Sequence, residues 1–71
     1  MSVSTINVTV NGERQFIAEG TTLLDLLEQL GEPYGAGVVE LNRKFVHSDS
    51  LETTVLQDGD EVEVLLLAFG G

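Results

Sequence analysis

Hydrophobic and polar residues alternate strictly near the start of the chain. Three apolar residues, Ile6, Val8 and Val10, alternate with polar ones, which is the period-two pattern of a half-buried strand. Asn11-Gly12 follows directly, and this pair favours a tight hairpin because a type I′ turn needs two residues that tolerate positive φ. The pattern predicts a β-hairpin whose second strand runs from about Glu13 to Ala18.

The apolar spacing changes to that of a helix after Glu19-Gly20. Apolar residues now recur at i, i+3, i+4 and i+7, a single stripe suited to face a sheet: Leu23, Leu26, Leu27 and Leu30. Thr21 or Thr22 can cap the helix, and Asp25 suits its first turn because it lies near the exposed amides. Gly31 is expected to end the helix, and residues 32–37 are expected to form a mobile loop.

Two short strands are predicted after this loop. The first begins at Val38 and reaches a turn near Asn42-Arg43, and the second returns through Phe45 and Val46. Residues 47–54 are polar, which predicts a loop or a single helical turn carrying Leu51 inward.

A final strand is predicted from Glu61 to about Leu67, after a tight turn at residues 58–60. Val62, Val64 and Leu66 share one face of this strand, and the opposite face carries Leu65, Leu67 and Phe69. If the helix covers the first face, the opposite one presents an exposed apolar patch leading to the C-terminus. Such patches often mark partner surfaces, so Leu65 and Leu67 are predicted to bind a partner protein; the alternative is that a loop covers them or that the twist of the strand turns them inward.

The order of elements predicts a single domain spanning residues 1–71. A hairpin, a crossover helix and further strands fit an α+β arrangement with a mixed sheet of four to five strands and the helix across one face. The first and last strands of such a sheet can pair at its centre. The last residues would then project from its end.

Composition narrows the class of partner. The chain holds 12 acidic and 3 basic residues, a formal net charge of −9, which disfavours nucleic acid and anionic membranes. The charge either suits docking on a basic protein surface or only keeps a small domain soluble. There is no cysteine, and neither a signal peptide nor an apolar run long enough to span a bilayer is recognisable, so a cytoplasmic protein is expected.

No segment carries the side chains of an active site. His47-Ser48-Asp49 has the residue types of a hydrolase triad, but consecutive residues cannot adopt that geometry, and a solvated loop is expected. The acidic run at residues 58–61 lacks a calcium-loop pattern, so a plain turn is expected there. Arg43 and Lys44 serve either solubility or partner orientation. We expect no catalytic residue, no metal site and no bound cofactor.

The chain ends in Ala68-Phe69-Gly70-Gly71, immediately after the predicted last strand. Glycine has no Cβ and few φ/ψ restrictions, so a Gly-Gly end can pass through a narrow channel in a partner enzyme. Four extended residues reach about 13 Å. A carboxylate is a poor electrophile, and its activation needs an enzyme that holds it against the α-phosphate of ATP.

Several segments together resemble one family over nearly the whole length: Val10-Asn11-Gly12, Thr22-Leu23-Leu24-Asp25-Leu26-Leu27, Leu41-Asn42, Leu56-Gln57-Asp58-Gly59-Asp60-Glu61-Val62-Glu63 and Gly70-Gly71. The chain resembles the sulfur carriers of thiamine biosynthesis, which are small ubiquitin-like proteins. The resemblance implies a β-grasp fold with residues 68–71 as a flexible tail.

The same resemblance implies a role for the tail. An E1-like adenylating enzyme would use ATP and Mg²⁺ to adenylate the carboxylate of Gly71, and a cysteine desulfurase persulfide would supply the sulfur of a thiocarboxylate. Thiazole synthase would consume that sulfur. Gly70, Phe69 and Ala68 would thread into these partners, and the chain itself would be a co-substrate without enzyme activity.

Two alternatives remain open at the sequence level. The chain could carry sulfur for molybdopterin, as the related small subunit of molybdopterin synthase does, or for another sulfur-containing product. Phe69 departs from the small or aliphatic residue of many thiamine carriers, whereas the tail lacks the proline-containing approach of the molybdopterin subunit. The chain could also be a ubiquitin-like binding module, with an inert tail or one joined to lysines.

Overall fold

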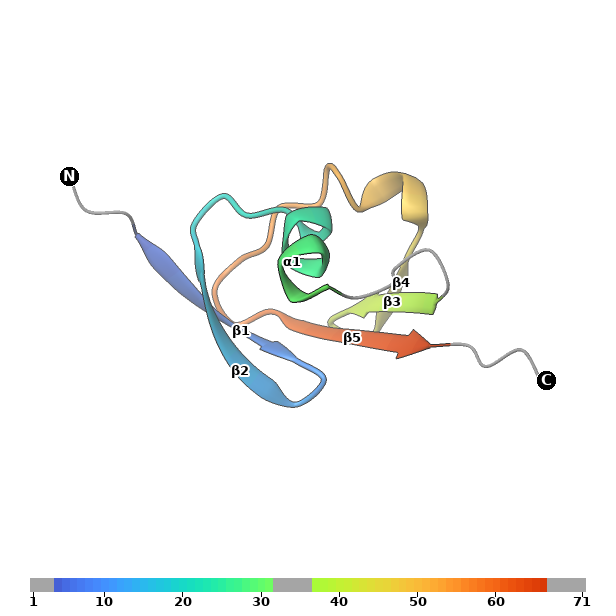
Figure 1. Cartoon of the computed structure of the whole chain (residues 1–71), viewed down its shortest axis with the longest axis horizontal. Helices are drawn as coiled ribbons and strands as arrows, with labels where there is room; N and C mark the ends of the chain where they lie inside the picture. Colours follow the sequence, from blue (N-terminus) through green and yellow to red (C-terminus); the bar gives the residue numbers. More distant parts are fainter. Residues whose placement is uncertain (1–3, 32–36, 67–71) are drawn as a thin grey trace.

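A computed structural model describes residues 4–31 and 37–66 of the chain (Figure 1). The elements follow in the order β1 (Thr5–Val10), β2 (Glu13–Ala18), α1 (Leu23–Leu30), β3 (Gly37–Leu41), β4 (Lys44–Val46), the 3-10 turn η2 (Ser48–Ser50) and β5 (Glu61–Leu66). The strands form one five-stranded sheet in the order β2-β1-β5-β3-β4. β1 and β5 are parallel, and the other neighbours are antiparallel, so the predicted mixed α+β sheet is confirmed.

Two tight turns form where the sequence predicts them. Asn11 and Gly12 have φ values of 48° and 85° between β1 and β2, which is the conformation of a type I′ turn. Asn42 and Arg43 have φ values of 52° and 70° between β3 and β4. Both turns therefore match the twist of the strands they join, and they set the register of the two hairpins.

The helix α1 begins and ends at local signals. Thr22 is the N-cap: its hydroxyl accepts a bond from the Asp25 amide at 3.1 Å, and the Asp25 carboxylate accepts one from the Thr22 amide at 3.3 Å. This reciprocal pair is a capping box. Gly31 ends the helix with a φ of 72°, a conformation that glycine adopts without steric cost.

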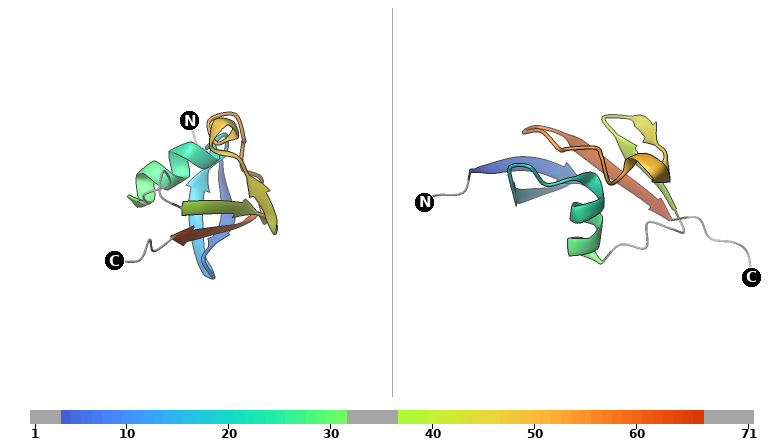
Figure 2. Two further views of the ribbon diagram at one scale, coloured as in Figure 1. Left: turned by 90° about the vertical axis from the view of Figure 1, so that its right-hand side faces the viewer. Right: turned by 90° about the horizontal axis from the view of Figure 1, so that it is seen from above.

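The core lies between α1 and one face of the sheet, here called the inner face (Figure 2). Leu23, Leu26 and Leu27 of the predicted stripe are buried, and Leu30 packs against the core at its edge. Leu51 is also buried, as predicted. The inner face supplies the remaining strand residues of the core: Ile6, Val8, Val10, Ile17, Val39, Val62 and Val64.

One predicted boundary is wrong. Gly37 was expected in the loop after the helix, but it begins β3, where it pairs with Leu66 of β5. The polar and glycine-rich composition of residues 32–37 does not indicate a strand, because the pairing of Gly37 depends on a partner that is distant in sequence. The rest of the predicted loop, residues 32–36, lies outside the described residues.

Candidate functional site

The strand that precedes the Gly-Gly end is central in the sheet. β5 lies between β1, with which it is parallel, and β3, with which it is antiparallel (Figure 1). Its Val62 and Val64 side chains are 1% and 7% exposed, so the strand is held on the inner face by core packing. The chain therefore runs from the central strand of the sheet toward its C-terminus.

Asn42 fastens the start of β5 to the β3–β4 turn. Its side-chain oxygen accepts a bond from the Glu61 amide at 2.9 Å, and its side-chain nitrogen donates to Asp60 Oδ1 at 3.0 Å. The other carboxylate oxygen of Asp60 accepts from the Gln57 amide at 2.8 Å. These side chains satisfy backbone groups at the entrance to β5, so they have a structural role.

Asp58 fastens the same turn to β1. Its carboxylate accepts a bond from the Asn7 amide at 2.8 Å, and the Gly59 amide donates to the Asn7 carbonyl at 2.7 Å. The acidic run at residues 58–61 is thus a turn that joins distant strands, and the prediction of a plain turn without a calcium site pattern is confirmed in its turn conformation. Two of the segments that carry the family resemblance, at residues 41–42 and 58–61, are explained by this bracing of β5.

Asn11 fastens β5 from the other side. Its amide donates to the Val62 carbonyl at 2.9 Å, and its side-chain oxygen accepts from the Val64 amide at 2.8 Å. The side chain thus continues the β1–β5 ladder by one bond after β1 has ended. The sequence predicted the turn at Asn11 but not this contact, which joins residues 53 positions apart.

The outer face of the sheet carries an apolar patch beside the end of β5. Leu65 is 48% exposed and pairs with the half-buried Val38 of β3, while Phe45 of β4 is 62% exposed and is the diagonal neighbour of Val38. We call Leu65, Val38 and Phe45 the Leu65 patch. The predicted exposure of Leu65 is confirmed. Its predicted partner Leu67 lies outside the described residues, and the sequence did not indicate Val38 or Phe45.

Two glutamates stand opposite one another on adjacent strands next to this patch. Glu40 of β3 pairs with Glu63 of β5, and Glu40 also pairs with Phe45. Like charges directly opposite one another in a sheet are destabilising, so this pair is not explained by the stability of the sheet. An apolar patch beside two carboxylates is suited to a partner surface with apolar and basic groups.

The chemistry predicted for the last residues depends on atoms that the structure leaves undescribed. Ala68, Phe69, Gly70 and Gly71 all lie outside the described residues, so their roles stay predictions. What the structure places is the strand that leads to them, through Leu66.

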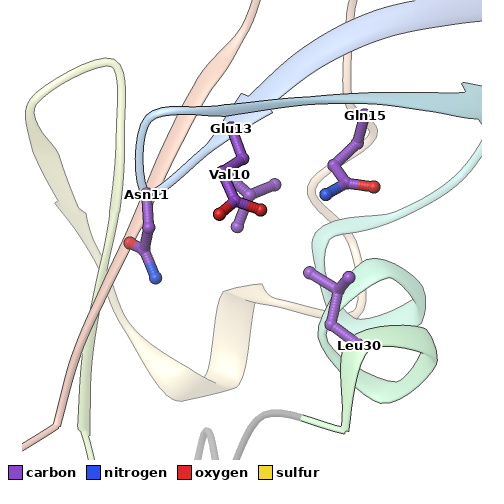
Figure 3. A pocket seen from close by; sticks show the side chains of 5 residues that line it. All are labelled: Val10, Asn11, Glu13, Gln15 and Leu30. Carbon is purple, nitrogen blue, oxygen red and sulfur yellow. The ribbon is translucent and has the colours of Figure 1, made fainter.

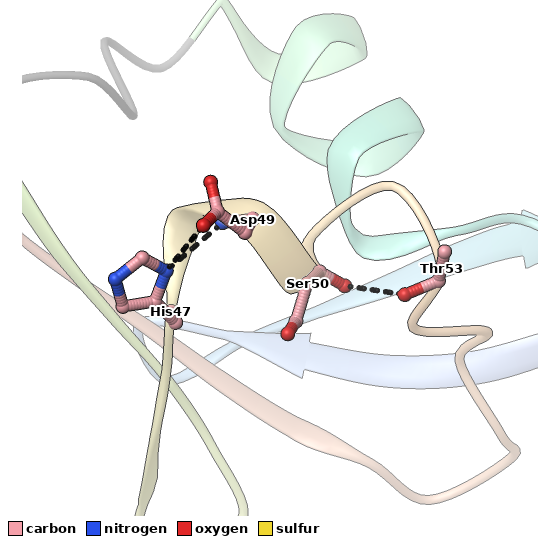
Figure 4. A network of polar contacts seen from close by, with 4 residues as sticks. All are labelled: His47, Asp49, Ser50 and Thr53. Atoms are coloured by element: carbon pink, nitrogen blue, oxygen red, sulfur yellow. Dashed lines mark hydrogen bonds and ion pairs between the residues drawn. The ribbon is translucent and has the colours of Figure 1, made fainter.

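The His47 segment caps a turn on the surface (Figure 4). His47 Nδ1 accepts a bond from the Asp49 amide at 3.1 Å and lies 3.5 Å from Asp49 Oδ2. The two side chains are 64% and 89% exposed. Both contacts shape η2 and leave the segment solvated, as predicted.

Within residues 4–31 and 37–66, no group of three or more His, Asp or Glu side chains is arranged to hold a metal ion. In the same part of the chain, no helix has the length and apolar character needed to cross a membrane.

Comparison with known proteins identifies the family. A crystal structure of the thiamine biosynthesis protein ThiS from Geobacter metallireducens matches with a TM-score of 0.81 and 33% identity, covering 93% of this chain and 100% of that one. A solution structure of a thiamine biosynthesis protein from the same organism matches with a TM-score of 0.74 and 33% identity, covering 93% and 88%.

A third solved structure is a complex of subunits 1 and 2 of the molybdopterin-converting factor from Helicobacter pylori. One of its chains matches with a TM-score of 0.55 and 27% identity, covering 96% of this chain and 100% of that one. No curated protein matches the sequence. The model of the ThiS family matches residues 5–71, and since this is nearly the whole length, the chain belongs to the ThiS family.

Proposed function

We propose that the chain is a sulfur carrier that serves thiazole formation in thiamine biosynthesis. The observation that carries this proposal is the extent of the family match, which continues through Gly71, the residue whose carboxylate would hold the sulfur. The similarity to ThiS of Geobacter metallireducens supports the thiamine branch. A central β5, braced by Asn42, Asp58 and Asn11, supports a body that docks while its tail extends into a partner.

The proposed reaction takes place in partner enzymes. The Gly71 carboxylate attacks the α-phosphate of ATP in an E1-like adenylating enzyme that supplies Mg²⁺, and pyrophosphate leaves. A persulfide sulfur, generated by a cysteine desulfurase, then attacks the acyl carbon, and AMP leaves. A thiol reductant cleaves the sulfur–sulfur bond of the acyl persulfide, so that a thiocarboxylate remains on Gly71 for thiazole synthase.

The chain's own part in this reaction is recognition and delivery. The Leu65 patch, extended by Leu67, would contact the partner, and the paired carboxylates of Glu40 and Glu63 would face basic groups on it. Ala68, Phe69 and Gly70 would thread into the active site. The protein is therefore a co-substrate, and it binds no cofactor of its own.

An intact-mass charging assay tests the proposal. The chain is incubated with ATP, Mg²⁺, a persulfide source and adenylating enzymes from the thiamine and molybdopterin branches. We expect the mass of one oxygen-to-sulfur exchange on Gly71 with the thiamine enzyme. Deletion of Gly71 should abolish charging because it removes the carboxylate that is adenylated, and it should leave the melting temperature unchanged because the described core is built from residues between Ile6 and Val64.

The outcomes separate the candidate functions. Charging by the molybdopterin enzyme alone would move the chain to that branch, the second candidate, which the similarity to a chain of the molybdopterin-converting factor supports. Isopeptide-linked adducts on lysines would identify a ubiquitin-like modifier. An unchanged mass under conditions that charge a known carrier would refute the carrier role.

A further inference from the structure

β5 has two neighbouring strands only in its first part. Its pairing with β1 comprises Thr9 with Glu61 and Val10 with Val62, whereas its pairing with β3 continues to Leu66. β1 ends because the chain turns back at Asn11-Gly12 into β2. Among the described residues, the last bond on the β1 side of β5 is the one from the Val64 amide to the Asn11 side chain.

The backbone of β5 beyond this bond has a defined direction. The carbonyls of Asp60 and Val62 accept bonds from β1 and its turn, and the Val64 amide donates to the same side. The Glu61 carbonyl accepts from Asn42 on the β3 side. Because strand residues alternate, the Val64 carbonyl and the Leu66 amide face away from β3, and no described residue pairs with them. We call these two groups the open edge of β5.

A hollow of about 200 Å³ begins where the β1–β5 pairing ends (Figure 3). Asn11, which binds Val64, also lines the hollow. Val10 and Leu30 give it apolar walls, and Figure 3 shows the Glu13 and Gln15 side chains directed into it. A strand lying along the open edge would place alternate side chains in this hollow and over the outer face beside Leu65.

We propose that an extended segment of the adenylating enzyme adds to the open edge of β5 as a further strand, with a Lys or Arg side chain in the hollow. Strand addition uses unpaired backbone groups for affinity and pockets for alternate side chains for specificity. The apolar stem of such a side chain matches Val10 and Leu30, and its cation matches the Glu13 carboxylate. The net charge of −9 disfavours an acidic segment.

This inference rests on the proposed carrier function. An added strand would hold the backbone at Leu66, so that the tail extends from a fixed point. Gly71 lies five positions after Leu66 in the chain. At about 3.3 Å per extended residue, a backbone held at Leu66 allows the carboxylate to reach about 17 Å from the added strand. Strand addition would thus orient the tail, whereas the Leu65 patch on the neighbouring face would supply apolar contact.

Hydrogen exchange on the wild-type chain tests the inference directly. The exchange rate of the Leu66 amide is measured by NMR, alone and with an adenylating enzyme that charges the wild-type chain. Pairing with an added strand should slow exchange at Leu66 at least tenfold. An unchanged exchange rate at Leu66 in the presence of the enzyme would overturn the inference, while the charging itself would uphold the carrier function.

Two variants of Leu66 test the same bond by kinetics. Leu66→Pro removes the amide hydrogen, and Leu66→Ala shortens the side chain but keeps that hydrogen. Because the Leu66 amide faces the open edge, proline removes no bond to β3. Relative to Leu66→Ala, Leu66→Pro should raise the KM for the carrier about tenfold, the effect of one lost hydrogen bond with its partner group left unpaired. Equal KM values would contradict strand addition.

A third variant tests the hollow without altering the strand. Glu13→Lys places a cation where the incoming cation should lie and should raise KM with little change in kcat. Glu13→Gln is the matched control and should have a smaller effect. If Glu13→Lys is charged with the wild-type KM, no basic side chain occupies the hollow. If no adenylating enzyme charges the wild-type chain, the carrier function fails, and the inference fails with it.

Discussion

Asn11 combines two roles that substitution can separate. It adopts a φ of 48° in the β1–β2 turn, and its side chain accepts the bond from the Val64 amide at 2.8 Å. Asn11→Gly keeps the turn conformation but removes the acceptor. Asn11→Ala removes the acceptor and also places a side chain with a Cβ and no local hydrogen bond at positive φ. Asn11→Asp keeps both an acceptor oxygen and tolerance of that conformation.

The magnitude follows from the partly buried position of the bond. Loss of the acceptor leaves the Val64 amide unpaired, which costs about 1–3 kcal/mol of the free energy of unfolding. We expect Asn11→Gly to lose about 2 kcal/mol and Asn11→Ala about 1 kcal/mol more, the cost of a left-handed conformation. For a domain of this size, each kcal/mol lowers the melting temperature by about 4–8 °C.

Urea unfolding of the three variants measures these differences, and hydrogen exchange locates them. Exchange of the Val64 amide should become faster in Asn11→Gly, while the Thr9 amide, which donates to the Asp60 carbonyl, should keep its protection relative to global unfolding. Asn11→Asp should remain within about 0.5 kcal/mol of the wild type, the usual range for a surface change without a lost contact. Wild-type stability and unchanged Val64 exchange in Asn11→Gly would refute the role of this side chain.

Two further predictions address the partner surface and the core. Leu65→Asp should keep the fold and raise the KM for charging about tenfold or more, because it places a carboxylate in the Leu65 patch. The control Phe16→Asp should leave KM unchanged, although Phe16 is more exposed, at 71%, on the same face of the distant β2. Equal effects of the two variants would show that the patch is not the docking site. Leu27→Ala should lower the free energy of unfolding by about 2–5 kcal/mol in urea titrations because Leu27 is fully buried. Leu24 is only half-buried, so Leu24→Ala should lower the free energy of unfolding clearly less. Similar losses in the two variants would contradict the assignment of Leu27 to the core.

Local chemistry made much of the fold predictable. The alternation at residues 6–10, the Asn11-Gly12 turn and the leucine stripe of the helix each depend on residues close in sequence. The helix cap was predicted as Thr21 or Thr22, and the capping box identifies Thr22. The parity of β5 likewise predicted that Leu65 would face away from Val62 and Val64.

The candidate site was only partly predictable because strand register is a long-range property. The Leu65 patch exists because β3 places Val38 opposite Leu65 and β4 places Phe45 opposite Glu40. No pattern within one strand specifies these pairs. The same limit applies to Gly37, which the sequence assigned to a loop and which pairs with Leu66 in the sheet.

The sequence by itself determined the elements, their inward faces and the family resemblance that directs attention to Gly71, since hydrophobic period, turn residues and motifs are written along the chain. Only the tertiary structure decided how β5 is held and where it is left unpaired. Asn11, Asn42 and Asp58 each bond a backbone amide of a segment distant in the chain, and β1 ends before β5 does. These features depend on which strands meet and in what register, and that is settled only when the core brings the segments together.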